Sequence, residues 1–107
     1  MSRSKANRTS EAEIGIAALI AARDRPTGWV TTSQLKKLIP SYITLTDDDQ
    51  KDSLTREGEQ LWHQIVGNII SHRTVEGNII AEGYATYERR GVAITDAGRA
   101  YLERPRR

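Results

Sequence analysis

Four polar side chains recur at helical spacing in residues 57–73. Gln60, Gln64, Asn68 and Ser71 stand at i, i+4, i+8 and i+11, and on an α-helix they fall within about 80° of arc. Primary amides can pair with the N6 and N7 atoms of adenine in the major groove of DNA, and a serine hydroxyl can donate or accept there. The spacing indicates a helix face that contacts base edges. The alternative is an ordinary exposed face made of modest helix formers.

The opposite half of the same helix is apolar. It carries Leu61, Trp62, Ile65, Val66, Ile69 and Ile70. Such a face must pack against the rest of the protein, which leaves the amide face outward. The outward face also holds Gly67, which weakens a helix by roughly 1 kcal/mol relative to Ala. We interpret this glycine as a point where the backbone can approach a partner closely.

Basic side chains flank this helix and are candidates for contacts with DNA phosphates. They lie before the helix, at its end and at a predicted hairpin turn: Arg56, His72, Arg73, Arg89 and Arg90. Adjacent arginines at a turn can reach phosphates or enter a minor groove, although charged turn residues can also serve only solubility. Glu57 and Glu59 would repel phosphate, but acidic residues are typical of a first helical turn.

Residues for other kinds of chemistry are scarce. The chain has no cysteine, and His63 and His72 would point in opposite directions on a helix, so they cannot share a metal. The acidic run that begins at Asp47 lacks the glycine and the closing glutamate of a calcium loop. We find no nucleophile with its base and no phosphate-binding glycine loop. The sequence therefore predicts a protein that is not an enzyme and needs no cofactor or metal.

The composition predicts one small soluble domain. The chain has 107 residues, of which 37% are hydrophobic and 28% charged. No apolar run approaches the ~20 residues needed to cross a bilayer, and the polar, basic N-terminus does not resemble a signal peptide. We therefore expect a cytoplasmic or nucleoid-associated location and no membrane partner.

The net charge of +2 conceals an uneven distribution. Residues 1–9 are predicted to be a flexible basic arm, residues 10–102 the folded domain, and residues 103–107 a frayed basic tail. Residues 9–102 hold ten Lys and Arg against thirteen Asp and Glu, a net charge of −3. A mildly acidic body disfavours strong non-specific binding of nucleic acid. The positions of the cations, rather than their number, must therefore carry any binding of DNA.

The rest of the sequence predicts the elements that would position these residues. An S-x-x-E capping box at Ser10 begins a first helix, which ends before Pro26. Residues 29–32 favour a short strand, and Ser33 is predicted to cap a second helix over residues 34–39. Residues 84–88 and 92–95 predict a hairpin turned by residues 89–91.

A last short helix, DAGRAYL, is predicted to begin at Thr95 and Asp96. Three helices followed by a hairpin are typical of a winged helix-turn-helix. We therefore expect an α+β fold that is mainly helical, with three to five helices, a small antiparallel sheet and a wing hairpin.

Two segments carry a family resemblance. LWHQIVGNIISHR, residues 61–73, and GNIIAEGYATYERRGVAITDAGRAYL, residues 77–102, resemble the winged-helix domain at the N-terminus of Mrr-type restriction endonucleases. They also resemble small domains that accompany HNH nucleases and restriction-modification genes, and the resemblance covers roughly residues 28–102. It does not imply cleavage, because the nuclease domains of such proteins are separate.

The resemblance implies a bacterial-type protein that binds double-stranded DNA. Its role would be that of a regulator or targeting module in a restriction or mobile-element system, with a nuclease subunit or a second copy as a further partner. The alternative is a protein-interaction module that dimerises and does not bind DNA. The mildly acidic body and the uncharged helix face favour that alternative.

Overall fold

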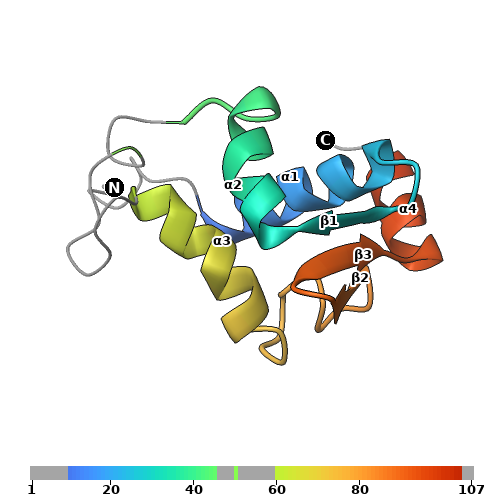
Figure 1. Ribbon diagram of the computed structural model, residues 1–107. Helices are drawn as coiled ribbons and strands as arrows, with labels where there is room; N and C mark the ends of the chain where they lie inside the picture. Colours follow the sequence, from blue (N-terminus) through green and yellow to red (C-terminus); the bar gives the residue numbers. More distant parts are fainter. Residues whose placement is uncertain (1–9, 46–49, 51–59, 105–107) are drawn as a thin grey trace.

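The computed structural model describes residues 10–45, 50 and 60–104. Within these ranges the chain forms four α-helices, one 3-10 helix and a three-stranded antiparallel sheet (Figure 1). In chain order they are α1 (Glu11–Asp24), β1 (Trp29–Thr31), α2 (Thr32–Leu38), η2 (Ile39–Ser41), α3 (Leu61–Ser71), β2 (Ala85–Glu88), β3 (Gly91–Ile94) and α4 (Asp96–Glu103). The predicted α+β class and its helical majority are confirmed. The predicted N-terminal arm, the acidic run around Asp47 and residues 105–107 lie outside the described ranges.

α1 is the central helix of the core. Its predicted capping box is present, since Glu13 N–H donates to Ser10 Oγ at 3.1 Å and Ser10 N–H donates to the Glu13 carboxylate at 2.9 Å. The inward side of α1 is built largely from small residues, and it is packed by α3, the sheet and α4. Its buried apolar members are Ile14, Ala17, Ala18, Leu19, Ala21 and Ala22. No helix in the described ranges is both long and apolar enough to cross a membrane.

α2 begins earlier than the sequence predicted. Its N-cap is Thr31 rather than Ser33: the Thr31 hydroxyl accepts from Gln34 N–H at 3.1 Å, and Thr31 N–H donates to the Gln34 amide oxygen at 3.0 Å. A reciprocal capping box needs Glu or Gln three residues after the N-cap. Thr31 has Gln34 at that position, whereas Ser33 has Lys36. α2 therefore starts directly where β1 ends.

The sheet has the order β1-β3-β2, with both neighbouring pairs antiparallel. Val92 in the central strand is paired with Val30 on one side and Tyr87 on the other. β3 begins at Gly91, one residue earlier than predicted, because the hairpin turn contains only Arg89 and Arg90. The hairpin tip consequently lies beside the junction of β1 and α2 (Figure 1).

The connection from α3 to β2 is organised by a buried asparagine. Asn78 is only 7% exposed, its amide nitrogen donates to the carbonyl of Ile69 at 2.9 Å, and its amide oxygen accepts from Ile80 N–H at 2.7 Å. An Asn side chain can replace backbone partners in a turn in this way, and it fixes the segment after α3 against the last turn of that helix.

Thr95 caps α4, as predicted, and also ties it to the segment before β2. Its hydroxyl accepts from Gly98 N–H at 3.0 Å and donates to the carbonyl of Gly83 at 2.6 Å. We expect Thr95→Ala to lower the free energy of unfolding by about 1–2 kcal/mol, because one substitution removes a helix cap and a second hydrogen bond. Urea unfolding followed by circular dichroism measures the change. Thr86→Ala, at an exposed position of β2, is the control and should change stability by less than about 0.5 kcal/mol.

Candidate functional site

The long amphipathic helix begins later than predicted. Gln60 has an extended backbone, with φ −95° and ψ 164°, and is the N-cap of α3. Its amide oxygen accepts from the Trp62 indole N–H at 2.8 Å, and its backbone N–H donates to Nδ1 of His63 at 3.0 Å. The prediction that the helix runs through residue 60 is therefore wrong, because these local hydrogen bonds end it there. Gln60 is not part of the outward helix face, and Arg56 and Glu57 lie outside the described residues.

The division of α3 into two faces is confirmed for four of the six residues predicted on the apolar face, whereas Leu61 and Ile70 are only half-buried. Trp62, Ile65, Val66 and Ile69 are each at most 8% exposed, as expected for a face packed on the core. On the other side, Gln64, Gly67 and Asn68 are half-buried and Ser71 is exposed. The polar side of α3 is therefore accessible from outside the fold.

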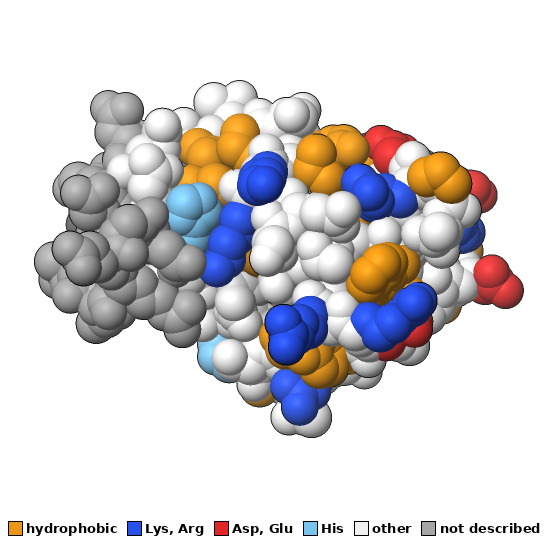
Figure 2. Space-filling model, in the orientation of Figure 1, with side chains coloured by type: hydrophobic (Ala, Val, Ile, Leu, Met, Phe, Trp, Pro, Cys, Tyr) orange, Lys and Arg blue, Asp and Glu red, His pale blue; other side chains and the backbone are white. Residues whose placement is uncertain are grey.

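A cleft of about 310 Å³ lies between this accessible side, α2 and the hairpin. It is lined by Thr32, Lys36, Gly67, Ile70, Ser71, Tyr87 and Arg90. None of these lining residues is acidic. Among the described residues, Figure 2 shows Lys and Arg side chains spread over the face that carries α3 and the hairpin, whereas Asp and Glu lie mainly on the α4 side of the view. The cleft is therefore suited to an anionic partner although residues 9–102 carry a net negative charge.

Arg89 and Arg90 form the hairpin tip, and both have a left-handed backbone with φ of 49° and 62°. Positive φ at both positions is the signature of a type I′ turn, for which Asn-Gly is the usual pair. An ordinary side chain in this conformation costs roughly 1–2 kcal/mol. The fold therefore holds two arginines where neither is the residue that the backbone favours.

The hairpin tip is anchored to the start of α2. The carbonyl of Arg90 accepts from the backbone N–H of Thr32 at 3.0 Å and from its hydroxyl at 3.3 Å. The Trp29 indole N–H donates to the carbonyl of Glu88 at 3.0 Å, and the Arg89 guanidinium lies 4.6 Å from the centre of the Trp29 ring. These contacts leave the Arg89 side chain 70% exposed. The two arginines are thus positioned by their backbone, and the Arg89 guanidinium also lies 3.9 Å from the Glu88 carboxylate.

Arg73 joins the C-terminal end of α3 to the hairpin. Its guanidinium donates to the carbonyl of Ile70 at 2.8 Å and lies 5.1 Å from the centre of the Tyr87 ring. Tyr87 is 43% exposed. Of the predicted site residues, Ser71, Arg73, Arg89 and Arg90 are therefore brought to one region around the cleft.

His72 is turned away from this region. Its Nδ1 lies 2.9 Å from the Glu11 carboxylate, so it joins the end of α3 to the start of α1. Asn68 precedes His72 by one helical turn on the same side of α3. The structure therefore separates these two residues from the basic cluster at the hairpin.

Five residues that line the cleft were not among the predicted site residues: Thr32, Lys36, Gly67, Ile70 and Tyr87. Lys36 stands in a helix that the sequence predicted, but nothing in the local pattern indicates which side of α2 faces α3. The position of Tyr87 beside α3 depends on the pairing of β2 with β3. The only sequence feature that could have indicated a role for Lys36 is the presence of a lysine in the helix before the amphipathic one.

Comparison of the chain with protein-family models, with curated proteins and with solved structures finds no match. The residues around the cleft provide the basis for a functional assignment. They combine four cations, a serine hydroxyl and an exposed tyrosine: Lys36, Arg73, Arg89, Arg90, Ser71 and Tyr87.

Proposed function

We propose that this chain is a winged-helix DNA-binding protein, in which α3 enters the major groove and the β2–β3 hairpin serves as the wing. The order of the elements, with a β1-β3-β2 sheet and a hairpin after the third helix, is compatible with that fold. The same order would fit other small α+β domains, so the residues on the accessible face must support the assignment.

The observation that carries the proposal is the pair of arginines at the hairpin tip. A turn that only had to reverse the chain would be more stable with Asn-Gly, yet Arg89 and Arg90 occupy both left-handed positions. Strained residues that persist in a fold often serve function. Two guanidinium groups beside a helix with an amide face suit phosphate contacts flanking a groove.

The amide face of α3 supports a contact with bases. The accessible side of the helix carries Gln64, Asn68 and Ser71. Gly67 lies between them, and a Cβ added to it would meet no atom within 4 Å. Gln and Asn can pair with adenine, and a missing side chain lets the helix approach base edges. Asn68 would then contact DNA on the side of α3 away from the wing, whereas His72 is paired with Glu11.

The biological setting follows from the family resemblance of residues 61–102. We propose a regulator or targeting module of a restriction or mobile-element system, with a nuclease subunit or a second copy of the chain as the protein partner. Such a module would bring DNA to a separate catalytic domain. In that setting the chain would act in the cytoplasm, in contact with the nucleoid.

Two adjacent lysines of α2 test the proposal. Lys36 lines the cleft, whereas Lys37 is exposed and does not line it. We expect Lys36→Ala to weaken binding of a mixed-sequence duplex about threefold or more at about 50 mM salt, because it removes one phosphate contact. Lys37→Ala, the matched control, should change the affinity by less than about twofold. Fluorescence anisotropy with a labelled duplex measures both.

The salt dependence gives an independent readout of the same titration. If the four cations around the cleft each contact a phosphate, a plot of the logarithm of the association constant against the logarithm of salt concentration should have a slope of about −3.6. Lys36→Ala should make that slope shallower by about 0.9. Equal effects of the two lysine substitutions would contradict the proposed orientation. A compact dimer in light scattering, with no response to any duplex at low salt, would favour the dimerisation module instead.

A further inference from the structure

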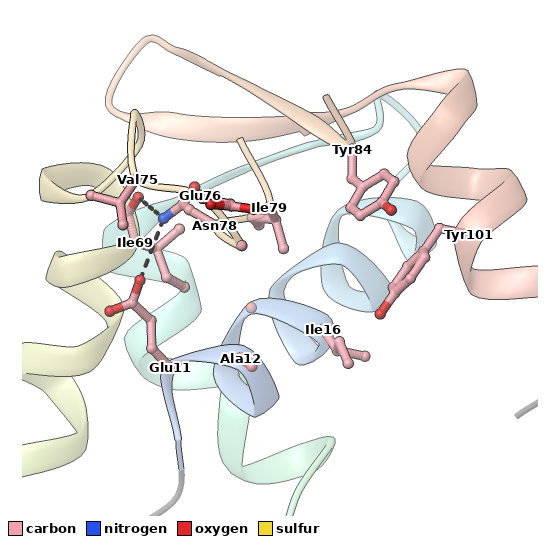
Figure 3. Close-up of a pocket in the computed structure, with 12 residues that line it drawn as sticks. Glu11, Ala12, Ile16, Ile69, Val75, Glu76, Asn78, Ile79, Tyr84 and Tyr101 are labelled. Atoms are coloured by element: carbon pink, nitrogen blue, oxygen red, sulfur yellow. Dashed lines mark hydrogen bonds between the residues drawn. The ribbon is translucent and has the colours of Figure 1, made fainter. Parts of the chain in front are cut away.

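A second cavity, of about 270 Å³, lies on the other side of α3 from the cleft. Its walls come from α1, from the last turns of α3, from the segment after that helix and from α4 (Figure 3). The residues that line it are Glu11, Ala12, Gly15, Ile16, Ile69, Val75, Glu76, Gly77, Asn78, Ile79, Tyr84 and Tyr101. From this lining we propose that the cavity binds a small organic cation, namely a primary amine with an aromatic body.

One end of the cavity is apolar and aromatic. The rings of Tyr84 and Tyr101 stack with their centres 4.4 Å apart, and Figure 3 shows both rings on the α4 side of the cavity with Ile16 below them. Val75, near the opposite end, is 54% exposed. An aromatic body that covered the two tyrosine rings and Ile16 would remove apolar surface from water, which favours binding.

The charge at the other end is negative. Glu11 and Glu76 are the only charged residues among those that line the cavity in the described part of the chain. The Glu11 carboxylate points toward the amide of Asn78, which donates to it at 3.4 Å, and its side chain is 33% exposed (Figure 3). A carboxylate can accept up to about four hydrogen bonds, so Glu11 can hold an ammonium group in addition to its contacts with His72 and Asn78.

The volume limits the size of the ligand. A water molecule occupies about 30 Å³ in the liquid, so 270 Å³ corresponds to about nine such volumes. A phenylalkylamine, which carries an aromatic ring at one end of a short chain and an ammonium group at the other, matches the arrangement of an aromatic end and an acidic end in a cavity of this volume. Larger amines would have to extend past Val75 into solvent.

Occupation of the cavity would bear directly on α3. Ile69, in the buried face of that helix, lines the cavity, and its carbonyl is held by Asn78 from the following segment at 2.9 Å. A ligand packed against both residues would favour one position of the last turns of α3. Any effect on DNA rests on the function proposed above, whereas the binding of the amine does not.

The test is an NMR titration of the 15N-labelled chain with 2-phenylethylamine in the absence of DNA. We expect amide shifts at Gly15, Gly77 and Tyr101, with a dissociation constant of about 1 mM or below, as the ligand efficiency of small fragments allows. The acid with the same phenylethyl group, 3-phenylpropionate, should bind at least about fivefold more weakly because it is repelled by Glu11. Equal binding of acid and amine, shifts elsewhere in the fold, or no shifts up to about 10 mM would overturn the proposal.

Two substitutions separate the site from the fold. Glu11→Gln should weaken binding of the amine at least about fivefold, whereas Glu103→Gln, which removes the same charge from α4, should leave it unchanged. Ala12→Leu, at an exposed position that lines the cavity, should fill the space and abolish binding without touching the core. The amide shifts of Gly15, Gly77 and Tyr101 should not depend on protein concentration when no ligand is present. If they do, a second copy of the chain occupies the cavity, and the proposal is overturned.

Discussion

The double variant Arg89→Asn/Arg90→Gly is expected to be more stable than the native chain and to bind duplex DNA at least about tenfold more weakly at about 50 mM salt. Both native residues have a left-handed backbone, with φ of 49° and 62°, and Asn-Gly relieves a strain of roughly 1–2 kcal/mol per residue. Loss of the contact between Arg89 and Trp29 offsets about 0.5–1 kcal/mol of this gain. The free energy of unfolding should therefore rise by about 1–3.5 kcal/mol, the difference between these two ranges.

The loss of affinity has a different cause from the gain in stability. Two cations leave the edge of the cleft, so the salt slope should become shallower by about 1.8, or about 0.9 for each lost phosphate contact. Urea unfolding and anisotropy titrations measure the two effects separately. A variant that is more stable and binds less cannot owe the loss of binding to unfolding.

The control for this variant removes the same formal charge elsewhere. Arg23→Ala/Arg25→Ala alters the C-terminal end of α1, where Arg23 is exposed and paired with Asp24 at 3.3 Å. This change should leave the salt slope within about 0.5 of the native value, because neither side chain lines the cleft. If the hairpin variant binds duplexes as the native chain does, the wing assignment is wrong.

The parts of the fold that could be predicted depend on local patterns. The buried and accessible faces of α3 follow from the helical repeat, and the caps at Ser10 and Thr95 follow from side chains that reach only three residues along the chain. The boundaries were less accurate where two local signals compete. At the start of α2, Ser33 looked like a cap, but Thr31 has Gln34 as its reciprocal partner.

The parts of the site that could not be predicted depend on contacts between distant residues. His72 was grouped with the basic residues, yet it is held by Glu11, 61 positions earlier. Lys36 was missed because its role depends on how α2 packs beside α3. The net charge of residues 9–102 was equally uninformative, since cations from α2, α3 and the hairpin gather on one face only when the chain folds.

The contact between the hairpin and β1 sets the position of the hairpin, and Gly91 is what allows this contact. A Cβ at this position would overlap the carbonyl oxygen of Val30 and lie 2.7 Å from the Cα of Thr31. Because these are backbone atoms of a paired strand, they cannot move aside as the end of a flexible side chain would. The first residue of β3 must therefore be a glycine for β1, α2 and the hairpin tip to meet.

We expect Gly91→Ala to lower the free energy of unfolding by about 3 kcal/mol or more, the upper range for overpacked sites. Against a total of about 5–15 kcal/mol for a typical domain, such a loss should be evident as a large fall in the urea midpoint.

Gly67→Ala is the matched control with the opposite sign. An added Cβ at this position would meet nothing within 4 Å, so alanine should stabilise α3 by about 0.5–1 kcal/mol through its higher helix propensity. The pair distinguishes a glycine that the fold requires from one that it does not. If Gly67→Ala proves more stable but binds DNA less tightly, the fold gains nothing from the glycine, and close approach to a partner is the reason for its presence. If Gly91→Ala is as stable as the native chain, the hairpin does not pack on β1 as described.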